Sequence, residues 1–251
     1  MTDTTSDHDG GWIVLFSGGK ESAWTLHRSQ ASGLDVRRLV YVHAADTSAY
    51  HTPATPVVRL AARSIGLPLV DAGLPTIDAE PPDVVADPAG ADADLRPLEE
   101  TVRELADALA DGLAGIVVGT VTDQHRADRV RSICDRVGCA FRAPLWGAEP
   151  RELAEAMLDG GLEIVVVEVT APGFDERWLG RQLDYEALAD LERLGHEYDV
   201  SLLGEGGEFE TVVTDGPHMS RPIGLEFERE WHGSWGRVRI TDAWLEDPAD
   251  E

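Results

Sequence analysis

The chain has 251 residues, a hydrophobic fraction of 43% and a formal net charge of −26. That length allows one large domain or two modest ones, and the apolar content is enough for a sizeable core. There is no apolar run of about 18 residues, no secretory leader in the acidic first ten residues and only two cysteines, which argues against a membrane span, secretion and a disulfide framework. We therefore expect a cytoplasmic protein with a disordered N-terminus, residues 1–10.

The basic residues are unusual because 20 of the 21 are arginine and Lys20 is the only lysine. Abundant acid with almost no lysine indicates a halophilic protein, since at about 1 M salt the Debye length is only ~3 Å and dense carboxylates repel one another little. An acidic surface is a poor match for a nucleic-acid backbone, so no nucleic-acid partner is expected, although high salt weakens this argument. The single lysine follows two glycines, which makes Lys20 a candidate functional residue.

The first half of the chain alternates predicted strands and helices. Leu98, Val102 and Leu105 lie on one face of an amphipathic helix that Gly112 can close. The other predicted elements are, in chain order, a buried strand at 12–16, a helix at 21–32, a strand at 36–43, a helix at 55–65, a short strand at 68–70, a strand at 115–119 and a helix at 126–137. Such alternation indicates an α/β fold, with a Rossmann-like parallel sheet covered by helices on both faces.

The character of the sequence changes after about residue 142. A helix at 150–158, a strand at 162–169 and two strands within 223–244 predict a smaller α+β unit. We therefore divide the chain into an α/β domain at 11–143 and a smaller C-terminal domain at 144–251. Residues 75–97 are rich in Pro, Asp and Ala without periodicity, and are either a surface insertion or a lid over the substrate.

A glycine loop follows the first predicted strand and comprises Ser17, Gly18, Gly19, Lys20, Glu21 and Ser22. The glycines let backbone N–H groups approach an anion, the start of the next helix adds about half a positive charge, and Lys20 adds a whole one. The pattern is neither G-x-x-x-x-G-K-[ST] nor G-x-G-x-x-G. It resembles Ser-Gly-Gly-x-Asp-Ser, the loop of the ATP pyrophosphatases, with Glu21 at the aspartate position. ATP and Mg²⁺ are the expected cofactors.

A second polar cluster begins where the strand at 115–119 ends. It includes Gly119, Thr120, Asp123, Arg126 and Arg129. Ligands bind at the carboxyl ends of parallel strands, so this cluster and the glycine loop should face the same crevice. Glu21 and Asp123 are candidate metal ligands, and Arg126 and Arg129 are candidate phosphate ligands; the alternative is that Asp123 caps the next helix and the arginines pair with surface acids.

Two further features complete the candidate site. His43 ends the second predicted strand near the expected adenine pocket, where it is either a nucleotide contact or a structural histidine. The segment Glu205, Gly206, Gly207, Glu208, Phe209, Glu210 and Thr211 alternates acids with glycines, which suggests close backbone approach to a ligand. Its acids suit a cation, and Phe209 suits a trimethylammonium group through cation–π attraction. An acidic hairpin in an acidic protein is the alternative.

Together these segments resemble one family. The glycine loop, the stretch 119–126, Pro144-Leu145-Trp146 and the segment 205–211 occur in this order in the archaeal diphthine–ammonia ligases. The resemblance runs over about 12–222; Glu21, Thr122, His125 and Phe209 depart from the family pattern. It implies that residues 11–143 are a nucleotide-binding domain with an adenine nucleotide alpha hydrolase-like fold of the HUP type, and that 144–251 are a substrate-binding domain. It also implies amidation of diphthine on elongation factor 2 with ammonium, through an acyl-adenylate, releasing AMP and pyrophosphate.

The resemblance suggests site roles that the residues alone do not fix. Lys20, Glu208 and Glu210 are the expected catalytic residues, and the segment 205–211 is the expected substrate site. A homodimer is compatible with the sequence. Two other functions stay open, a tRNA-modifying ATP pyrophosphatase of the thiolation or lysidine type and a non-enzymatic nucleotide sensor. Thiolation normally needs a cysteine pair, whereas Cys134 and Cys139 are expected to pack in the core.

Overall fold

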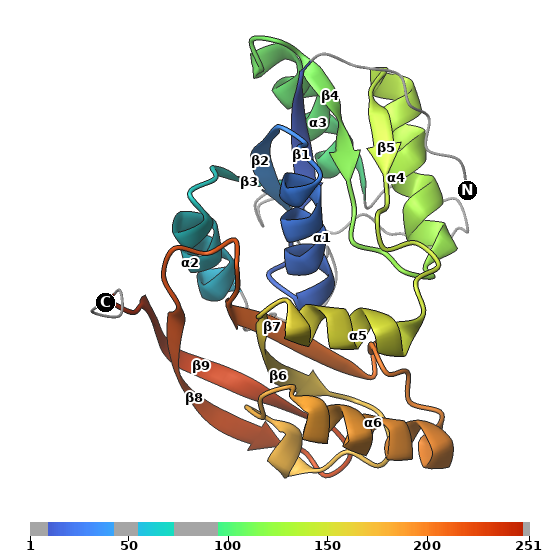
Figure 1. The fold of residues 1–251 in the computed structure, drawn as a ribbon, viewed down its shortest axis with the longest axis vertical. Coiled ribbons are helices and arrows are strands. Elements are labelled where there is room, and N and C mark those ends of the chain that lie inside the picture. The colour runs from blue at the N-terminus through green and yellow to red at the C-terminus, as the bar shows by residue number, and fades with distance from the viewer. Residues whose placement is uncertain (1–9, 43–54, 73–94, 248–251) are drawn as a thin grey trace, which may run out of the picture.

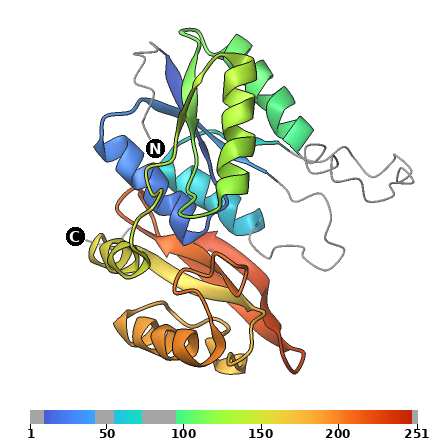
Figure 2. The ribbon, with the colours of Figure 1, turned by 90° about the vertical axis from the view of Figure 1, so that its right-hand side faces the viewer.

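The computed structural model describes residues 10–42, 55–72 and 95–247, which form two sheets with helices around them (Figures 1 and 2). The predicted disorder of residues 1–9, the role of His43 and nearly all of the 75–97 loop lie outside these described residues. Arg96 and Pro97, at the end of that loop, begin a helix instead.

The first sheet is parallel and has the strand order β3-β2-β1-β4-β5. Its central strand, β1, is the apolar segment Gly11–Leu15, and parallel pairing on both sides buries it. The elements of this half are β1 (Gly11–Leu15), α1 (Lys20–Ala31), β2 (Val36–Tyr41), α2 (Thr55–Ile65), β3 (Leu69–Asp71), α3 (Arg96–Ala108), β4 (Leu113–Val117), α4 (Gln124–Val137) and β5 (Ala140–Arg142). The predicted Rossmann-like fold is confirmed.

Side chains alternate between the two faces of this sheet. In β1, Trp12 and Val14 join the hydrophobic cluster under α1 and α2, whereas Ile13 joins the cluster under α3 and α4. Each face is thus covered by two helices, and the strands need apolar residues on both sides. Cys134 is 1% exposed in the second cluster, which confirms its expected packing role. Cys139 packs at the edge of the same cluster.

The second sheet is antiparallel, with the order β7-β6-β9-β8. It has four strands, one fewer than the first sheet, and Figure 1 places helices α5 and α6 beside it. The elements of this half are α5 (Pro150–Asp159), β6 (Glu163–Val169), the 3-10 helix η2 (Glu176–Trp178), α6 (Tyr185–Tyr198), β7 (Phe209–Asp215), β8 (Ile223–Trp231) and β9 (Gly236–Leu245). None of the helices in the described part of the chain combines the length and apolar content needed to cross a membrane.

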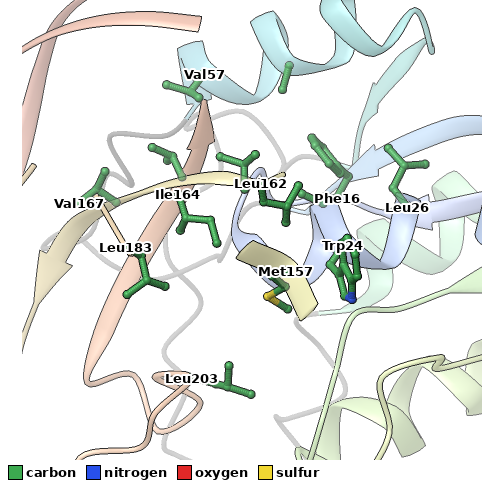
Figure 3. Packing of buried hydrophobic residues seen from close by; sticks show 14 of the residues in the cluster. Phe16, Trp24, Leu26, Val57, Met157, Leu162, Ile164, Val167, Leu183 and Leu203 are labelled. Carbon is green, nitrogen blue, oxygen red and sulfur yellow. The ribbon is translucent and has the colours of Figure 1, made fainter. Parts of the chain in front are cut away.

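One hydrophobic cluster joins the two halves. It contains Phe16 and Trp24 of the first half together with Met157 and Ile164 of the second (Figure 3). Each of these four side chains is at most 8% exposed, so water is excluded from the junction. The boundary at residues 143–144 stays a prediction, but the two sheets share a continuous apolar core and a fixed arrangement follows from it.

The position of β7 connects the core to the candidate site. This strand forms an edge of the second sheet, and its free side lies against the glycine loop. The Val213 N–H donates to the Gly18 carbonyl oxygen (2.9 Å), and the Lys20 N–H approaches the Thr211 hydroxyl (3.4 Å). The edge strand that would otherwise expose unpaired backbone groups is thereby covered, and the segment 205–211 is brought next to the loop.

Candidate active site

The glycine loop curls tightly between β1 and α1. Gly18 has a φ of +81°, which favours glycine, and a side chain there would also press on Val58. The hydroxyls of Ser17 and Ser22 lie 3.2 Å apart, and the Ser22 hydroxyl donates to the Gly19 carbonyl oxygen (2.9 Å). The two serines therefore hold the loop in shape while α1 begins at Lys20. No side chain caps the helix start through Gly19, but the Lys20 N–H approaches the Thr211 hydroxyl, so the N–H groups of Glu21 and Ser22 are the ones suited to a ligand anion.

Lys20 is buried in this structure, with 3% of its surface exposed. Its ammonium nitrogen forms an ion pair with Glu21 Oε1 (2.9 Å) and sits 4.8 Å from the centre of the Phe209 ring. The ring itself is 1% exposed. The cation that Phe209 faces in this structure is Lys20, and its predicted contact with a trimethylammonium group stays a prediction.

The polar cluster after β4 packs directly on the start of α1. A Cβ at Gly119 would lie 2.7 Å from the Glu21 carbonyl oxygen and 2.8 Å from the Thr25 hydroxyl, so only glycine fits there. Asp123 caps α4, because its Oδ1 accepts the Arg126 N–H (2.9 Å). Asp123 Oδ2 also lies 3.5 Å from Arg126 Nε. The capping alternative is thus confirmed, and a metal role for Asp123 stays a prediction.

The acidic segment is fixed by its glutamates in different ways. Glu205 Oε1 accepts the N–H groups of Val121 (3.2 Å) and Thr122 (3.0 Å), and Oε2 accepts the Thr122 hydroxyl (2.8 Å). Glu208 Oε1 accepts the Ser201 N–H (3.0 Å), while its Oε2 is buried and has no hydrogen-bond partner among the described residues. Glu205 therefore fastens this segment to the β4–α4 loop rather than presenting both of its oxygens to a ligand.

Glu210 is the glutamate of the segment whose pKa is affected by the charged side chains of the glycine loop. Desolvation raises its pKa; the positive charge of Lys20 opposes that shift, the negative charge of Glu21 adds to it and Arg126 opposes it. Directly opposite on β6 lies Glu168, which is 5% exposed. Burial and the charge of Glu210 raise the pKa of Glu168, and Arg237 opposes the shift. Glu168 has no motif around it, and only the β6–β7 register could have revealed it.

All three predicted segments line one cavity of about 650 Å³. From the loop, the β4–α4 cluster and the acidic segment, the predicted residues that line it are Ser17, Gly19, Lys20, Glu21, Ser22, Gly119, Thr120, Asp123, Arg126, Arg129, Glu205, Gly207, Phe209 and Glu210. Gly18, Gly206, Glu208 and Thr211 do not line it. Thr211 contacts the glycine loop through its hydroxyl, which accepts the Lys20 N–H.

The cavity also contains residues that the sequence did not single out as a site. One part of its wall is apolar and comes from the ends of strands, the start of α3 and α4; its members are Leu15, Phe16, Val40, Val42, Leu95, Leu98, Val118 and Val130. Their periodicity marks them as core residues, and only the fold leaves them facing the cavity. An apolar wall beside a polar one suits a nucleotide base next to its phosphates.

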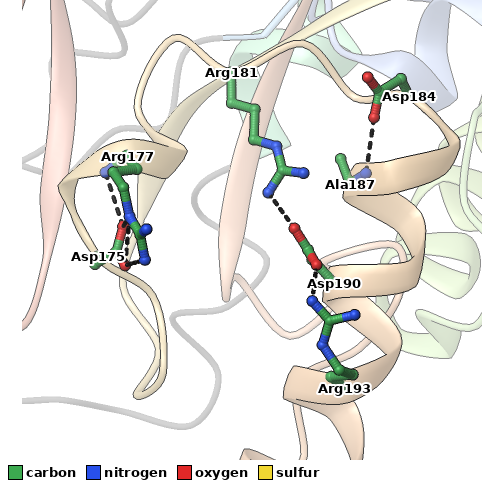
Figure 4. Close-up of polar contacts among 7 residues, drawn as sticks. All are labelled: Asp175, Arg177, Arg181, Asp184, Ala187, Asp190 and Arg193. Carbon is green, nitrogen blue, oxygen red and sulfur yellow. Dashed lines mark hydrogen bonds and ion pairs between the residues drawn. The ribbon is translucent and has the colours of Figure 1, made fainter.

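A second hollow, of about 720 Å³, lies between η2 and α6. Its charged side chains pair with one another, as Figure 4 shows: Arg177 with Asp175, and Arg181 and Arg193 with Asp190. These arginines are occupied by the protein's own acids. Because these charged groups are already paired with one another, the hollow is less suited to bind a charged ligand. The cavity at the glycine loop is the stronger candidate site.

A parallel sheet with a glycine-rich loop after its first strand, facing a cavity with one apolar and one polar wall, defines a Rossmann-like protein of the nucleotide-using class. Models of the N-terminal and C-terminal domains of diphthamide synthase match residues 10–141 and 149–245. These matches cover most of the chain. The chain belongs to the diphthamide synthase family.

Individual relatives agree with this assignment. The chain is 28% identical over 221 residues to the diphthine–ammonia ligase of Bos taurus, covering 84% of this chain and 80% of that protein. It is 27% identical over 221 residues to that of Homo sapiens, with the same coverage. Among solved structures, a predicted subunit of tRNA methyltransferase from Methanocaldococcus jannaschii covers 82% of this chain and 98% of that chain, at 17% identity and a TM-score of 0.43.

Proposed function

We propose that this protein is a ligase that amidates diphthine on elongation factor 2 with ammonium, and that it uses ATP to do so. The relatives bear the name of this activity. The single structural observation in support is that the glycine loop, the β4–α4 cluster and the acidic segment line one cavity. Adenylation takes place at an oxygen of the substrate carboxylate and ammonia then attacks the carbon of the same group, so a shared cavity is what the reaction requires.

The first half-reaction is adenylation. An oxygen of the substrate carboxylate attacks the α-phosphorus of ATP, the bond to the β-phosphate oxygen breaks, and pyrophosphate leaves with both electrons. The start of α1 and Lys20 are suited to hold that pyrophosphate, because helix N–H groups and a full positive charge converge there. Lys20 must then exchange part of its contact with Glu21 for the phosphate oxygens.

The second half-reaction is amidation. Ammonium has no lone pair, so a base must take one proton before the nitrogen attacks the acyl carbon and AMP leaves. Glu210 suits this role because it lines the cavity and its pKa is raised by desolvation. Glu208, whose Oε2 is buried without a partner, lies in the same segment and helps to shape it. The nitrogen loses a second proton as the tetrahedral intermediate collapses and AMP leaves with the electrons of the acyl–oxygen bond, so the products are the amide, AMP and two protons that pass to water.

Mg²⁺ fits this site only as a companion of the nucleotide. Within the described residues there is no group of three or more His, Cys, Asp or Glu side chains placed to hold a metal. Glu21 and Asp123 line the cavity, and one or two carboxylates plus phosphate oxygens are the usual ligands of Mg²⁺. When bound, the ion would neutralise phosphate charge. Glu21 would have to turn from Lys20 toward it.

We further propose the setting in which the enzyme works. It acts in a cytoplasm of high salt, which suits a net charge of −26. Its macromolecular partner is elongation factor 2 rather than a nucleic acid. A homodimer remains compatible with the chain, and gel filtration with light scattering would measure it.

The test combines a substrate assay with product analysis. Elongation factor 2 from cells that lack this gene, incubated with the protein, ATP and ammonium, should change from diphthine to diphthamide in its mass spectrum. AMP and pyrophosphate should appear in equal amounts. Lys20→Ala should lower the rate about 100-fold or more, because a preorganised charge is lost, whereas Lys20→Arg should retain part of it. ADP and phosphate as products, or unchanged diphthine, would refute the proposal.

A further inference from the structure

Arg129 lies on α4 and lines the cavity, one helical turn beyond Arg126. Its Nε and Nη2 atoms are both buried and have no hydrogen-bond partner within the described residues. Buried N–H groups of an arginine are costly to leave unpaired, and arginines in folded proteins are almost always paired when buried. This side chain therefore has two donors held in place for a group that the described residues do not supply.

The other cations that line the cavity have partners. Lys20 forms an ion pair with Glu21, and Arg126 lies beside Asp123. Away from the cavity, the arginine next along the face of α4, Arg136, is hydrogen-bonded to Glu99 through the same two atoms, Nε and Nη2. In a chain with 47 acidic and 21 basic residues, carboxylates are plentiful. An arginine without a carboxylate partner in the described part of this chain is therefore an exception that calls for a ligand.

The unpaired atoms identify the chemistry of that ligand. Nε–H and Nη2–H point from one edge of the guanidinium and match two oxygens of a single phosphate or carboxylate group. We propose that Arg129 binds a phosphate group of the nucleotide through this edge, from the α4 side of the cavity. This proposal rests on the function proposed above and assigns a residue to its nucleotide site.

A nucleotide phosphate suits the position better than the carboxylate of the acceptor. The cavity is lined by Glu21, Asp123 and Glu210, which repel an incoming triphosphate, and the ion pairs of Lys20 and Arg126 offset only part of that charge. The β4–α4 turn also touches the start of α1, since a Cβ at Gly119 would contact the Glu21 carbonyl oxygen. The α4 wall thus adjoins the loop that is suited to hold the pyrophosphate.

The test is calorimetric titration of the full-length protein in molar KCl with ATP, AMP and adenosine. Arg129→Gln removes the charge, and Arg129→Lys keeps the charge but removes the two-donor edge. Both variants should bind ATP at least 10-fold more weakly, which corresponds to about 1.4 kcal/mol. Adenosine should bind within 2-fold of the unaltered protein, and the loss for AMP indicates whether the α-phosphate is the group held.

The control is Arg131→Lys, since Arg131 lies on the same helix, forms an ion pair with Asp128 and does not line the cavity. It should leave all three affinities unchanged. Because Nε and Nη2 of Arg129 have no hydrogen-bond partner to lose within the described residues, Arg129→Gln should melt at or above the temperature of the unaltered protein. A normal melt therefore separates lost binding from lost folding.

Three outcomes overturn the proposal. ATP and AMP affinities unchanged within 2-fold would show that Arg129 does not bind a nucleotide phosphate. If the KM for diphthine-bearing elongation factor 2 also rises, Arg129 binds the acceptor carboxylate instead. An equal loss for adenosine and ATP would give Arg129 a structural or base-binding role. An unaltered protein that binds none of the three ligands would also refute it. ATP binding with no amidation of elongation factor 2 would refute only the proposed function.

Discussion

Glu205 is predicted to hold the segment 205–211 against the β4–α4 loop, and its removal should destabilise the part of the cavity that these two segments form. Glu205→Ala deletes acceptors for three hydrogen bonds, two from backbone N–H groups and one from the Thr122 hydroxyl. A net contribution of about 0.5–1.5 kcal/mol each sets an upper range, and because water can reach these groups we expect about 1–2 kcal/mol in total. For a chain of this size that lowers the melting temperature by about 2–8 °C.

The assay is thermal unfolding in molar KCl together with titration of ATP. Glu205→Gln keeps one carbonyl oxygen for the two N–H groups and should lose less than half as much stability as Glu205→Ala. Glu100→Ala is the control, because Glu100 is exposed on α3 and far along the chain from this contact. ATP should bind more weakly to Glu205→Ala, since the β4–α4 loop loses its support. If Glu205→Ala melts with the control and still fails to amidate, Glu205 acts on the substrate directly and the fastening role is wrong.

Three further predictions concern charge. The amidation rate should rise as pH increases through the raised pKa of Glu210, because the base works deprotonated, and Glu210→Gln should abolish amidation with ATP binding retained. Burial, with a smaller effect from His27, lowers the pKa of His218 to about 4 in the folded protein. Because the unfolded chain takes up this proton below pH ~6.5 and the folded protein does not, stability of at most about 3 kcal/mol, fully present above pH ~6.5, is lost as pH falls toward 4. His218→Phe should flatten this acid dependence in a thermal melt, and His196→Phe on the exposed face of α6 should not. Unfolding temperature and activity should both increase up to molar KCl, because a net charge of −26 repels itself in dilute buffer.

Each of these has a distinct contrary result. A Glu210→Gln variant that amidates at the unaltered rate places the base elsewhere. An acid dependence that survives in His218→Phe means that other groups, such as paired carboxylates, govern acid unfolding. A melting temperature that does not respond to KCl removes the argument that the acidic composition is an adaptation to salt.

The sequence alone was sufficient for the local elements and the reaction class. Apolar runs bounded by glycines predicted β1 and β4, and the periodicity of Leu98, Val102 and Leu105 predicted α3. These features depend on neighbours within about ten residues, which is the range that hydrophobic periodicity reports. The glycine loop was visible for the same reason, since its chemistry lies in six consecutive residues.

Some elements escaped the sequence because their signals were weak or short. Strand β5 has three residues, Ala140–Arg142, which is too few for a period to appear. Helix α6 was missed although Asp184 caps it by accepting the Ala187 N–H and although Leu188 and Leu191 are buried at helical spacing. That helix could have been found by its cap; β5 could not, because pairing with β4 alone makes it a strand.

Only the tertiary structure decided which side chains meet. Glu205 and Thr122 are 83 residues apart, and Lys20 and Thr211 are 191 apart, yet each pair is in contact. The sequence grouped three glutamates into one motif, whereas the fold gives Glu205 a backbone to fasten and leaves Glu210 facing Lys20 and Glu21. Composition and spacing determine what chemistry a chain can carry, because residue type fixes charge and local geometry. Which partner each charge meets depends on how two sheets close on a common core, and no window of sequence contains that information.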